Sequence, residues 1–226
     1  MSATWDTVSS LATGFGTLVL AIATFASVRS ANRAARVAQQ ALLVGTQPLL
    51  VPSHLGDAVQ KAFYQDGRYH VVEGGRGAVA FENGVVYLAI SVRNVGNGVA
   101  VLHGWHFTAG REEVPVQPDP DSFRRQGLDL LIAPGELGYW EGAFRDSDDP
   151  QYDDAVTAAK DGELLSLDVL YGDYEGGQRI ISRLMLRRGG EDPSRSAPAS
   201  PNSLGGSGYW IATVVRHWNI DRPNFR

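Results

Sequence analysis

The chain has no cysteine among its 226 residues. Disulfide bonds, thiolate nucleophiles, iron–sulfur clusters and zinc ribbons are therefore excluded together. Charge is absent from a long N-terminal stretch, because no Asp, Glu, Lys or Arg occurs between Thr7 and Val28. Basic residues are not in excess either, since the formal net charge is -5. Nothing in this composition favours a nucleic-acid partner.

The uncharged stretch is long and apolar enough to be a membrane anchor. About 20 residues at helical rise cross a hydrocarbon core, and residues 7–28 reach that length. Trp5 stands where an interfacial aromatic belongs, and the only side-chain charge before the stretch is Asp6, which argues against a cleaved secretory signal. A buried core helix is the remaining alternative. The anchor side chains expected to face lipid are Leu11, Phe15, Leu18, Leu20, Ile22, Phe25 and Val28.

Arginines follow the apolar stretch directly. Arg29, Arg33 and Arg36 come before the next acidic residue, Asp57, whereas no Lys or Arg precedes the stretch. The positive-inside rule therefore predicts a single-pass protein of the cell membrane whose C-terminal domain is cytoplasmic. The same arginines would lie near anionic headgroups, with about 1 kcal/mol of attraction each.

Alanine-rich sequence continues the helix beyond the arginines until Gly45 ends it. The chain thus divides into residues 1–46, a transmembrane helix with a helical juxtamembrane extension, and residues 47–226. Within the first part, Ala12 and Gly16 stand four residues apart. This spacing of small residues could let two helices pack closely and form a homo-oligomer.

Short apolar or alternating runs, separated by Gly, Asn, Asp and Pro, fill residues 47–226. This pattern predicts an antiparallel β-sandwich, with immunoglobulin-like connectivity as one of its forms. Asn97–Gly98 and Gly176–Gly177 predict tight hairpins between the strands that flank them. The nine expected strands cover residues 49–53, 78–81, 85–93, 99–109, 128–133, 138–144, 164–171, 179–187 and 209–218.

Two segments interrupt the predicted strands. Asp149 as N-cap, Pro150 in the first helical position and Gly162 after the last turn predict one short helix. Residues 189–208 are rich in Gly, Ser and Pro, and they contain too little apolar surface to offset their ordering entropy. They are therefore predicted to be a flexible loop.

No segment carries a specific metal or catalytic pattern. Asp146, Asp148 and Asp149 could offer oxygens to calcium, but the segment lacks the glycine and closing glutamate of a calcium loop, and acids also favour helix starts. His103 and His106 stand three apart on a predicted strand and are expected to point to opposite faces. No G-x-S-x-G occurs. We expect no resident metal, no cofactor and no enzymatic activity.

The C-terminal tail is rich in aromatic and basic residues. Arg216, Trp218, Arg222 and Phe225 belong to residue types that are common at interfaces, so the tail could contact a protein partner or the membrane interface. The alternative is that Trp218 packs on the sandwich while the arginines are solvated.

Four stretches carry a resemblance to other proteins: Arg29–Arg36, Pro48–Pro52, Arg93–Gly98 and Arg216–Trp218. In these the chain resembles bacterial single-pass membrane proteins of uncharacterised function, which combine an N-terminal helix, an Arg- and Ala-rich helical extension and a β-sandwich. The resemblance covers most of the chain. It implies the same architecture and carries no known activity.

The expected function follows from an anchor joined to a domain with few candidate sites. The first hypothesis is a membrane-anchored binding or structural module, such as an accessory subunit of a membrane protein assembly, whose partners are the bilayer and a protein. The second is a sensor whose small-molecule or ion ligand lies between sandwich loops and whose helix transmits the signal. The third is a hydrolase, which two close acids with opposed pKa shifts in a cleft would favour.

Overall fold

The computed structural model of the protein describes residues 2–110, 116–191 and 208–221. The chain divides into two compact units, one ending at Gly45 and the other beginning at Thr46. The division falls one residue before the boundary that the sequence predicts. The first unit is a helix and the second is mainly β.

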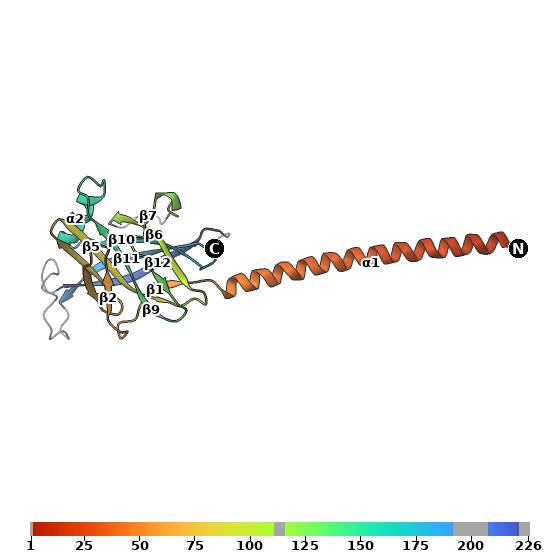
Figure 1. Ribbon diagram of the computed structural model, residues 1–226, viewed down its shortest axis with the longest axis horizontal. Helices are drawn as coiled ribbons and strands as arrows, with labels where there is room; N and C mark the ends of the chain where they lie inside the picture. The colour runs from red at the N-terminus through yellow and green to blue at the C-terminus, as the bar shows by residue number, and fades with distance from the viewer. Residues whose placement is uncertain (1, 111–115, 192–207, 222–226) are drawn as a thin grey trace. The chain divides into compact units, whose positions relative to one another are not determined.

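Helix α1 (Ser2–Gly45) forms the whole described part of the first unit (Figure 1). Its Gly14–Leu43 segment is long and apolar enough to cross a membrane, with a mean hydropathy of 1.4, and none of its apolar window is buried. The Thr24 hydroxyl donates to the Leu20 carbonyl at 2.8 Å, which satisfies a polar group inside the apolar segment.

The second unit is an antiparallel β-sandwich. Its first sheet contains β9 (Leu137–Phe144), β5 (Val85–Asn94), β4 (Arg76–Glu82) and β1 (Leu50–Pro52), the last two paired with successive parts of β5. Its second sheet contains β12 (Gly208–Asn219), β11 (Ile180–Glu191), β10 (Leu165–Gly172), β6 (Ala100–Ala109), β7 (Arg124–Arg125) and β8 (Leu131–Ile132). Two residue pairs between β4 and β12 join these two sheets at one corner, so that the ten strands form one continuous hydrogen-bonded sheet folded into two layers.

Strand connectivity follows an immunoglobulin-type pattern in five strands. β5 pairs with β9 in the first sheet, while β10 lies between β6 and β11 in the second. The B–E and C–F–G pairings of immunoglobulin domains have the same order along the chain. Strand β12 is added beyond β11.

The predicted hairpin at Asn97–Gly98 is wrong, because β5 and β6 do not pair with each other: β5 pairs with β1, β4 and β9, and β6 with β7, β8 and β10. Neither Asn97 nor Gly98 has the positive φ that a two-residue hairpin turn would need. The segment instead packs against the start of the domain, where Asn97 and Gly98 both donate their N–H groups to the Gln47 carbonyl. The other predicted hairpin is confirmed, since β10 pairs with β11 and Gly176 has a φ of 77°.

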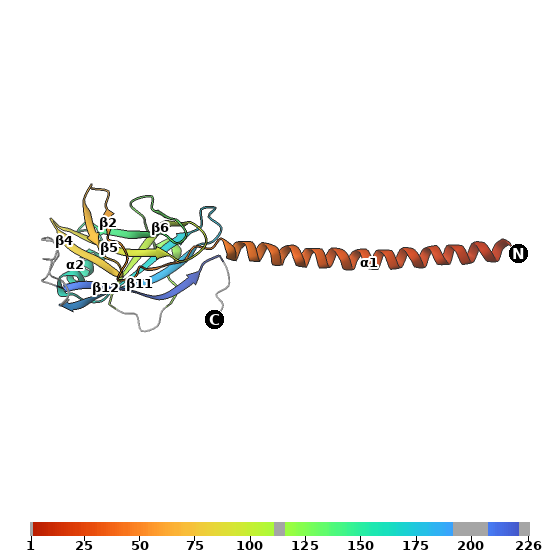
Figure 2. The ribbon, with the colours of Figure 1, turned by 90° about the horizontal axis from the view of Figure 1, so that it is seen from below.

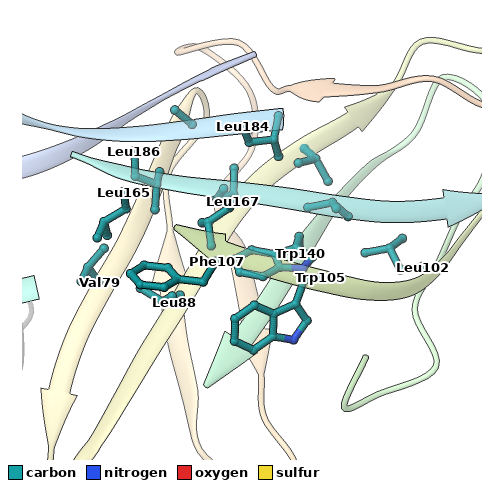
Figure 3. Close-up of a cluster of buried hydrophobic side chains, with 14 of the residues drawn as sticks. Val79, Leu88, Leu102, Trp105, Phe107, Trp140, Leu165, Leu167, Leu184 and Leu186 are labelled. Carbon is teal, nitrogen blue, oxygen red and sulfur yellow. The ribbon is translucent and has the colours of Figure 1, made fainter. Parts of the chain in front are cut away.

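The main core fills the space between the two sheets (Figure 3). Alternate residues of each strand point inward, so Leu88 and Trp140 from the first sheet meet Phe107 and Leu167 from the second. The Trp140 ring, which is fully buried, packs edge-on against the Trp105 ring at 5.6 Å between centroids.

Helix α2 (Tyr152–Asp161) covers part of this core with three buried alanines, Ala155, Ala158 and Ala159. It begins later than predicted. Gln151 is the N-cap residue, and Asp149 instead accepts the Gln151 N–H in a turn that precedes the helix. Gly162 ends the helix in the left-handed conformation, as predicted.

The predicted loop over residues 189–208 is shorter at both ends. Gly189 and Gly190 belong to β11, Gly208 belongs to β12, and Glu191 pairs with Gly208 after a register irregularity. This pairing extends β11 and β12 beyond the predicted strands, which covered residues 179–187 and 209–218. Residues 192–207 lie outside the described residues.

Strands β2 (Gln60–Phe63) and β3 (Tyr69–Val72) form a separate two-stranded sheet that is not among the strands predicted from the sequence. This hairpin lies outside β5 on the first sheet (Figure 2). Its inner side chains Ala62, Tyr64 and Val72 pack against Ala80, Tyr87 and Ala89 of that sheet.

Candidate functional site

The outer face of the β2–β3 hairpin exposes four large apolar side chains close together. Because side chains alternate along a strand, Ala62 and Val72 turn inward, and their neighbours turn outward. The outward residues are Val59, Lys61, Phe63, Tyr69 and Val71, which we call the docking face. Its four apolar members are 56%, 47%, 52% and 50% exposed, in that order.

The docking face has an ordered centre. Phe63 is opposite Tyr69 in the strand register, and their ring centroids are 5.6 Å apart. The Lys61 ammonium lies 5.5 Å from the centroid of the Tyr69 ring. In the described residues β2 and β3 pair only with each other, so their outer edges retain backbone groups that could pair with another strand.

Three polar contacts, one of them fully buried, fix the hairpin on the sandwich. The Tyr64 hydroxyl donates to the Leu88 carbonyl at 3.1 Å, and the Tyr87 hydroxyl donates to an Asp66 carboxylate oxygen at 2.6 Å. The Arg68 guanidinium pairs with Glu82 at 2.8 Å. Burial, together with the bond to Asp66, raises the pKa of Tyr87 to about 12. The docking face is therefore presented by an element that is attached from its inner side.

Two carboxyl groups near this attachment have opposed pKa shifts. Burial raises the pKa of Glu141, which accepts a hydrogen bond from the Gln126 amide at 2.9 Å. For Asp66, hydrogen bonds from Tyr87 and the Arg68 backbone, with nearby arginines, outweigh desolvation, and its pKa is lowered. Only 2% of the Glu141 surface is exposed, and Asp66 is already hydrogen-bonded. Glu141 is therefore not accessible to a substrate in this structure, so the pair does not favour a hydrolase.

Replacing Glu141 by glutamine is expected to raise the free energy of unfolding by about 1 kcal/mol at pH 8, a typical single-residue effect. The folded protein binds the Glu141 proton more tightly than the unfolded chain does, because burial raises the pKa. The stability from this group is full below the unfolded pKa and is lost as pH rises through the folded pKa. Glu141→Gln should therefore be more stable than wild type at pH 8, and its advantage should shrink toward pH 5.

Urea denaturation at both pH values measures this difference. Glu136→Gln is the matched control, because Glu136 is an exposed carboxylate at the preceding turn. The control should change stability by less than about 0.5 kcal/mol at either pH. A Glu141→Gln protein that is less stable than wild type at pH 8 would contradict the argument from burial.

Two carboxylates of the acidic segment have partners within the protein. Asp149 is paired with Arg124, whose guanidinium also bonds the Gln151 side chain at 2.8 Å. Asp146 accepts the backbone N–H of Asp148 at 2.9 Å. No group of three or more potential metal ligands occurs among the described residues.

His103 and His106 differ from the expectation that they point to opposite faces. The register of β6 against β10 shifts between Leu170 and Tyr171, so Leu102 and Trp105 both enter the core. This β-bulge places both histidines on the outer face. His103 is exposed there, whereas His106 is half-buried with its Nδ1 3.8 Å from the Asp168 carboxylate.

The tail residues fall into three groups. Trp218 is only 4% exposed and packs with Leu170 and Ile181 on the outer side of the second sheet. Arg216 is exposed, with its guanidinium carbon 5.7 Å from the centroid of the Trp218 ring. Arg222 and Phe225 lie outside the described residues. Trp218 therefore has the packing that the alternative reading of the tail predicts.

The predicted anchor residues lie along α1. Phe15, Leu18, Leu20, Ile22, Phe25 and Val28 are between 53% and 70% exposed. Leu11 and Ala12 belong to the helix, and their side chains lie outside the described residues, while an added Cβ at Gly16 would meet nothing within 4 Å. Arg29, Arg33 and Arg36 are exposed on the same helix.

The sequence does contain a signal for the missed hairpin. Asp66–Gly67 is a turn dipeptide between two runs that alternate apolar and polar residues, and Gly67 has a φ of 78°. Each of the two strands is only four residues long. Runs this short are hard to recognise in the sequence beside the longer apolar runs of the other strands.

Comparison of the chain with protein-family models, curated proteins and solved structures found no match.

Proposed function

We propose that the protein is a membrane-tethered module that binds a protein partner through the docking face of its β2–β3 hairpin. The observation that carries the proposal is the exposed aromatic pair Phe63 and Tyr69 on a hairpin whose inner side is hydrogen-bonded to the sandwich. Aromatic residues on a fixed support lose little conformational entropy on binding, and they are enriched at the centres of interfaces. In a membrane assembly such a module would act as an accessory subunit.

The proposed tether is α1, with the domain on the cytoplasmic side. A helix with an exposed apolar segment needs a partner for that surface, and lipid is the partner that suits its length and composition. Arg29, Arg33 and Arg36 at the C-terminal end of the apolar run, with no basic residue before it, favour the cytoplasmic orientation.

The docking face also limits the chemistry of the partner. Three of the 20 basic residues and one of the 25 acidic residues precede Thr46, so the remainder of the chain has a formal net charge of -7. The docking face has only a positive charge, Lys61, within this acidic domain. We therefore propose an extended apolar partner segment that places a carboxylate opposite Lys61 and pairs with an open edge of the hairpin.

The double substitution Phe63→Ala/Tyr69→Ala is expected to weaken partner binding at least about 30-fold, as for hot-spot residues. Both rings are about half exposed, so their removal should leave the sandwich folded. The full-length protein would be extracted in mild detergent, and the copurifying proteins would be quantified by mass spectrometry. A photo-crosslinking residue at position 63 would identify the protein that touches the docking face.

Tyr174 supplies the matched control, because it is 78% exposed at the β10–β11 turn. Tyr174→Ala should retain the partner, and a photo-crosslinking residue at position 174 should not capture it. Retention of the same partner by the Phe63→Ala/Tyr69→Ala protein would sink the assignment of the docking face. A wild-type protein that copurifies with no partner would sink the accessory-subunit function.

Sensing is the second candidate function, and one observation favours it. The Leu50 N–H donates to the Tyr171 hydroxyl at 3.1 Å, Tyr171 bonds Ser182 at 2.8 Å, and Ser182 bonds His217 Nδ1 at 2.6 Å. This chain of bonds links β1, at the start of the domain, with β12, and burial lowers the pKa of His217. If the protein copurifies with no partner, the next experiment is to screen small molecules and ions for ligands that change the hydrogen bonds between Leu50, Tyr171, Ser182 and His217.

A further inference from the structure

The three arginines of α1 lie on one face of the helix. Positions 29, 33 and 36 follow the spacing i, i+4 and i+7, so at 3.6 residues per turn their side chains leave the helix within a sector of about 60°. They line a shallow hollow together with Phe25, Val28 and Asn32. The hollow is apolar on the side of the uncharged run and cationic beyond it.

Nothing in the described chain neutralises these arginines. No ion pair joins them to a described residue, all three are exposed, and no acidic residue lies between Thr7 and Asp57. The positive charge is confined to this part of the helix, because the chain from Thr46 onward has a net negative charge. An anion from outside the chain is the complementary partner.

The position of the arginines along the helix matches the depth of lipid headgroups. The uncharged run ends at Val28, so Arg29 begins the polar side of the proposed span. At a rise of 1.5 Å per residue, Arg33 and Arg36 lie about 6 Å and 10 Å further along the axis. The headgroup layer on each side of a bilayer is about 5 to 8 Å thick, so Arg29 and Arg33 fall within it.

We propose that this face is a binding site for an anionic phospholipid. Arg29 and Arg33 hold the phosphate, because guanidinium groups pair with phosphate through two parallel hydrogen bonds. Arg36 bonds the outer part of the headgroup, and Phe25 and Val28 contact the first segment of an acyl chain. The proposal rests on the membrane anchoring proposed above and adds the class of lipid that the anchor selects.

The opposite side of the helix carries no charged side chain, so a lipid phosphate would be bound on the arginine face only. Ser27, Ala31, Ala34 and Ala38 fall there by the same geometry, and none of them can bond a phosphate with a charged group. Ala31 lies about 160° around the helix from Arg33 and only about 3 Å away along its axis. An arginine moved from 33 to 31 would therefore keep its charge and approximate depth while leaving the site.

The test uses the full-length protein in vesicles of phosphatidylcholine and phosphatidylglycerol at a ratio of about four to one. The same lipid composition is used for every variant. After gentle extraction, native mass spectrometry measures the ratio of the two lipids that remain bound. Arg33→Ala is expected to lower the phosphatidylglycerol enrichment about fivefold, the effect of one headgroup contact. The charge-conserving variant Arg33→Ala/Ala31→Arg should show the same loss.

Four results would overturn the proposal in distinguishable ways. Full enrichment in Arg33→Ala/Ala31→Arg would mean that net charge near the bilayer is sufficient and no site exists. Wild-type protein that inserts into the vesicles without enriching phosphatidylglycerol would sink the lipid site but leave the anchoring intact. Soluble glycerol phosphate that displaces the bound lipid at equal concentration would show a general phosphate site. Protein that fails to insert would remove both the anchoring and the site.

Discussion

Replacing Arg183 by leucine is expected to lower the free energy of unfolding by about 3 to 5 kcal/mol, the effect of stranding a buried charge. Arg183 on β11 lies directly opposite Asp168 on β10 in the strand register. Two bonds of 2.7 Å join their side chains, which are 5% and 1% exposed. The Trp218 ring covers the guanidinium at 5.2 Å. Removing the arginine leaves the buried Asp168 carboxylate without its cationic partner.

The double variant Asp168→Leu/Arg183→Leu separates the charge effect from lost packing. Replacing a buried ion pair by apolar residues is often neutral or stabilising, so the double variant should recover most of the loss. Urea denaturation of the wild type, the two single variants and the double variant gives the coupling energy. If Asp168→Leu/Arg183→Leu is as unstable as Arg183→Leu alone, packing and not the stranded carboxylate causes the loss.

Arg179→Ala is the control for a surface pair in the same strand region. Arg179 bonds Asp221 at 2.8 Å, but their side chains are 44% and 27% exposed. Exposed pairs contribute about 0 to 1 kcal/mol, so this variant should be close to wild type. An equal loss in Arg179→Ala and Arg183→Leu would show that burial does not control the energetics of these pairs.

The sequence predicts strands well where most of seven or more consecutive residues are apolar. Residues 85–93 and 164–171 fall within β5 and almost wholly within β10, because one side of each strand faces the common core. The pattern does not show which strands pair. Asn97–Gly98 has the composition of a hairpin turn, yet long-range bonds to Gln47 make it a crossover between sheets.

Several features of the candidate sites could not be predicted from the sequence, because they depend on strand register or lie on very short strands. The β-bulge at His103 reverses the expected alternation, and its cause is the register against a partner strand about 70 residues away, at Leu170 and Tyr171. The pairing of Asp168 with Arg183 likewise depends on register, and each residue alone resembles an outward polar position. The docking face was missed because its strands are short, although Asp66–Gly67 marks their turn.

Replacing Gly98 by alanine is expected to destabilise the domain by about 3 kcal/mol, the upper part of the range for overpacking. An added Cβ at this position would lie 1.8 Å from the Thr46 carbonyl oxygen, which no real contact permits. The backbone of Thr46 and Gln47 would have to move. Those residues are the first of the domain, and Gln47 is held by the Asn97 N–H at 3.0 Å and by Asn219 at 2.6 Å.

Urea denaturation measures the stability of Gly98→Ala, and hydrogen exchange of residues 46–50 measures whether the start of the domain detaches. Gly56→Ala is the control, because an added Cβ there meets nothing within 4 Å and the backbone has no positive φ. Exchange at 46–50 should rise in Gly98→Ala and stay at the wild-type level in Gly56→Ala. Equal behaviour of the two variants would mean that the contact at Gly98 does not fasten this segment.

The same variant separates the two candidate functions. The docking face is carried by β2 and β3, which are attached to the first sheet through Tyr64 and Asp66 and not through Gly98. A partner that binds the docking face should therefore still copurify with Gly98→Ala under conditions where the domain stays folded. Signalling from the domain into α1 would instead depend on the fastened segment 46–50, so a sensor should lose its response in this variant while retaining its ligand.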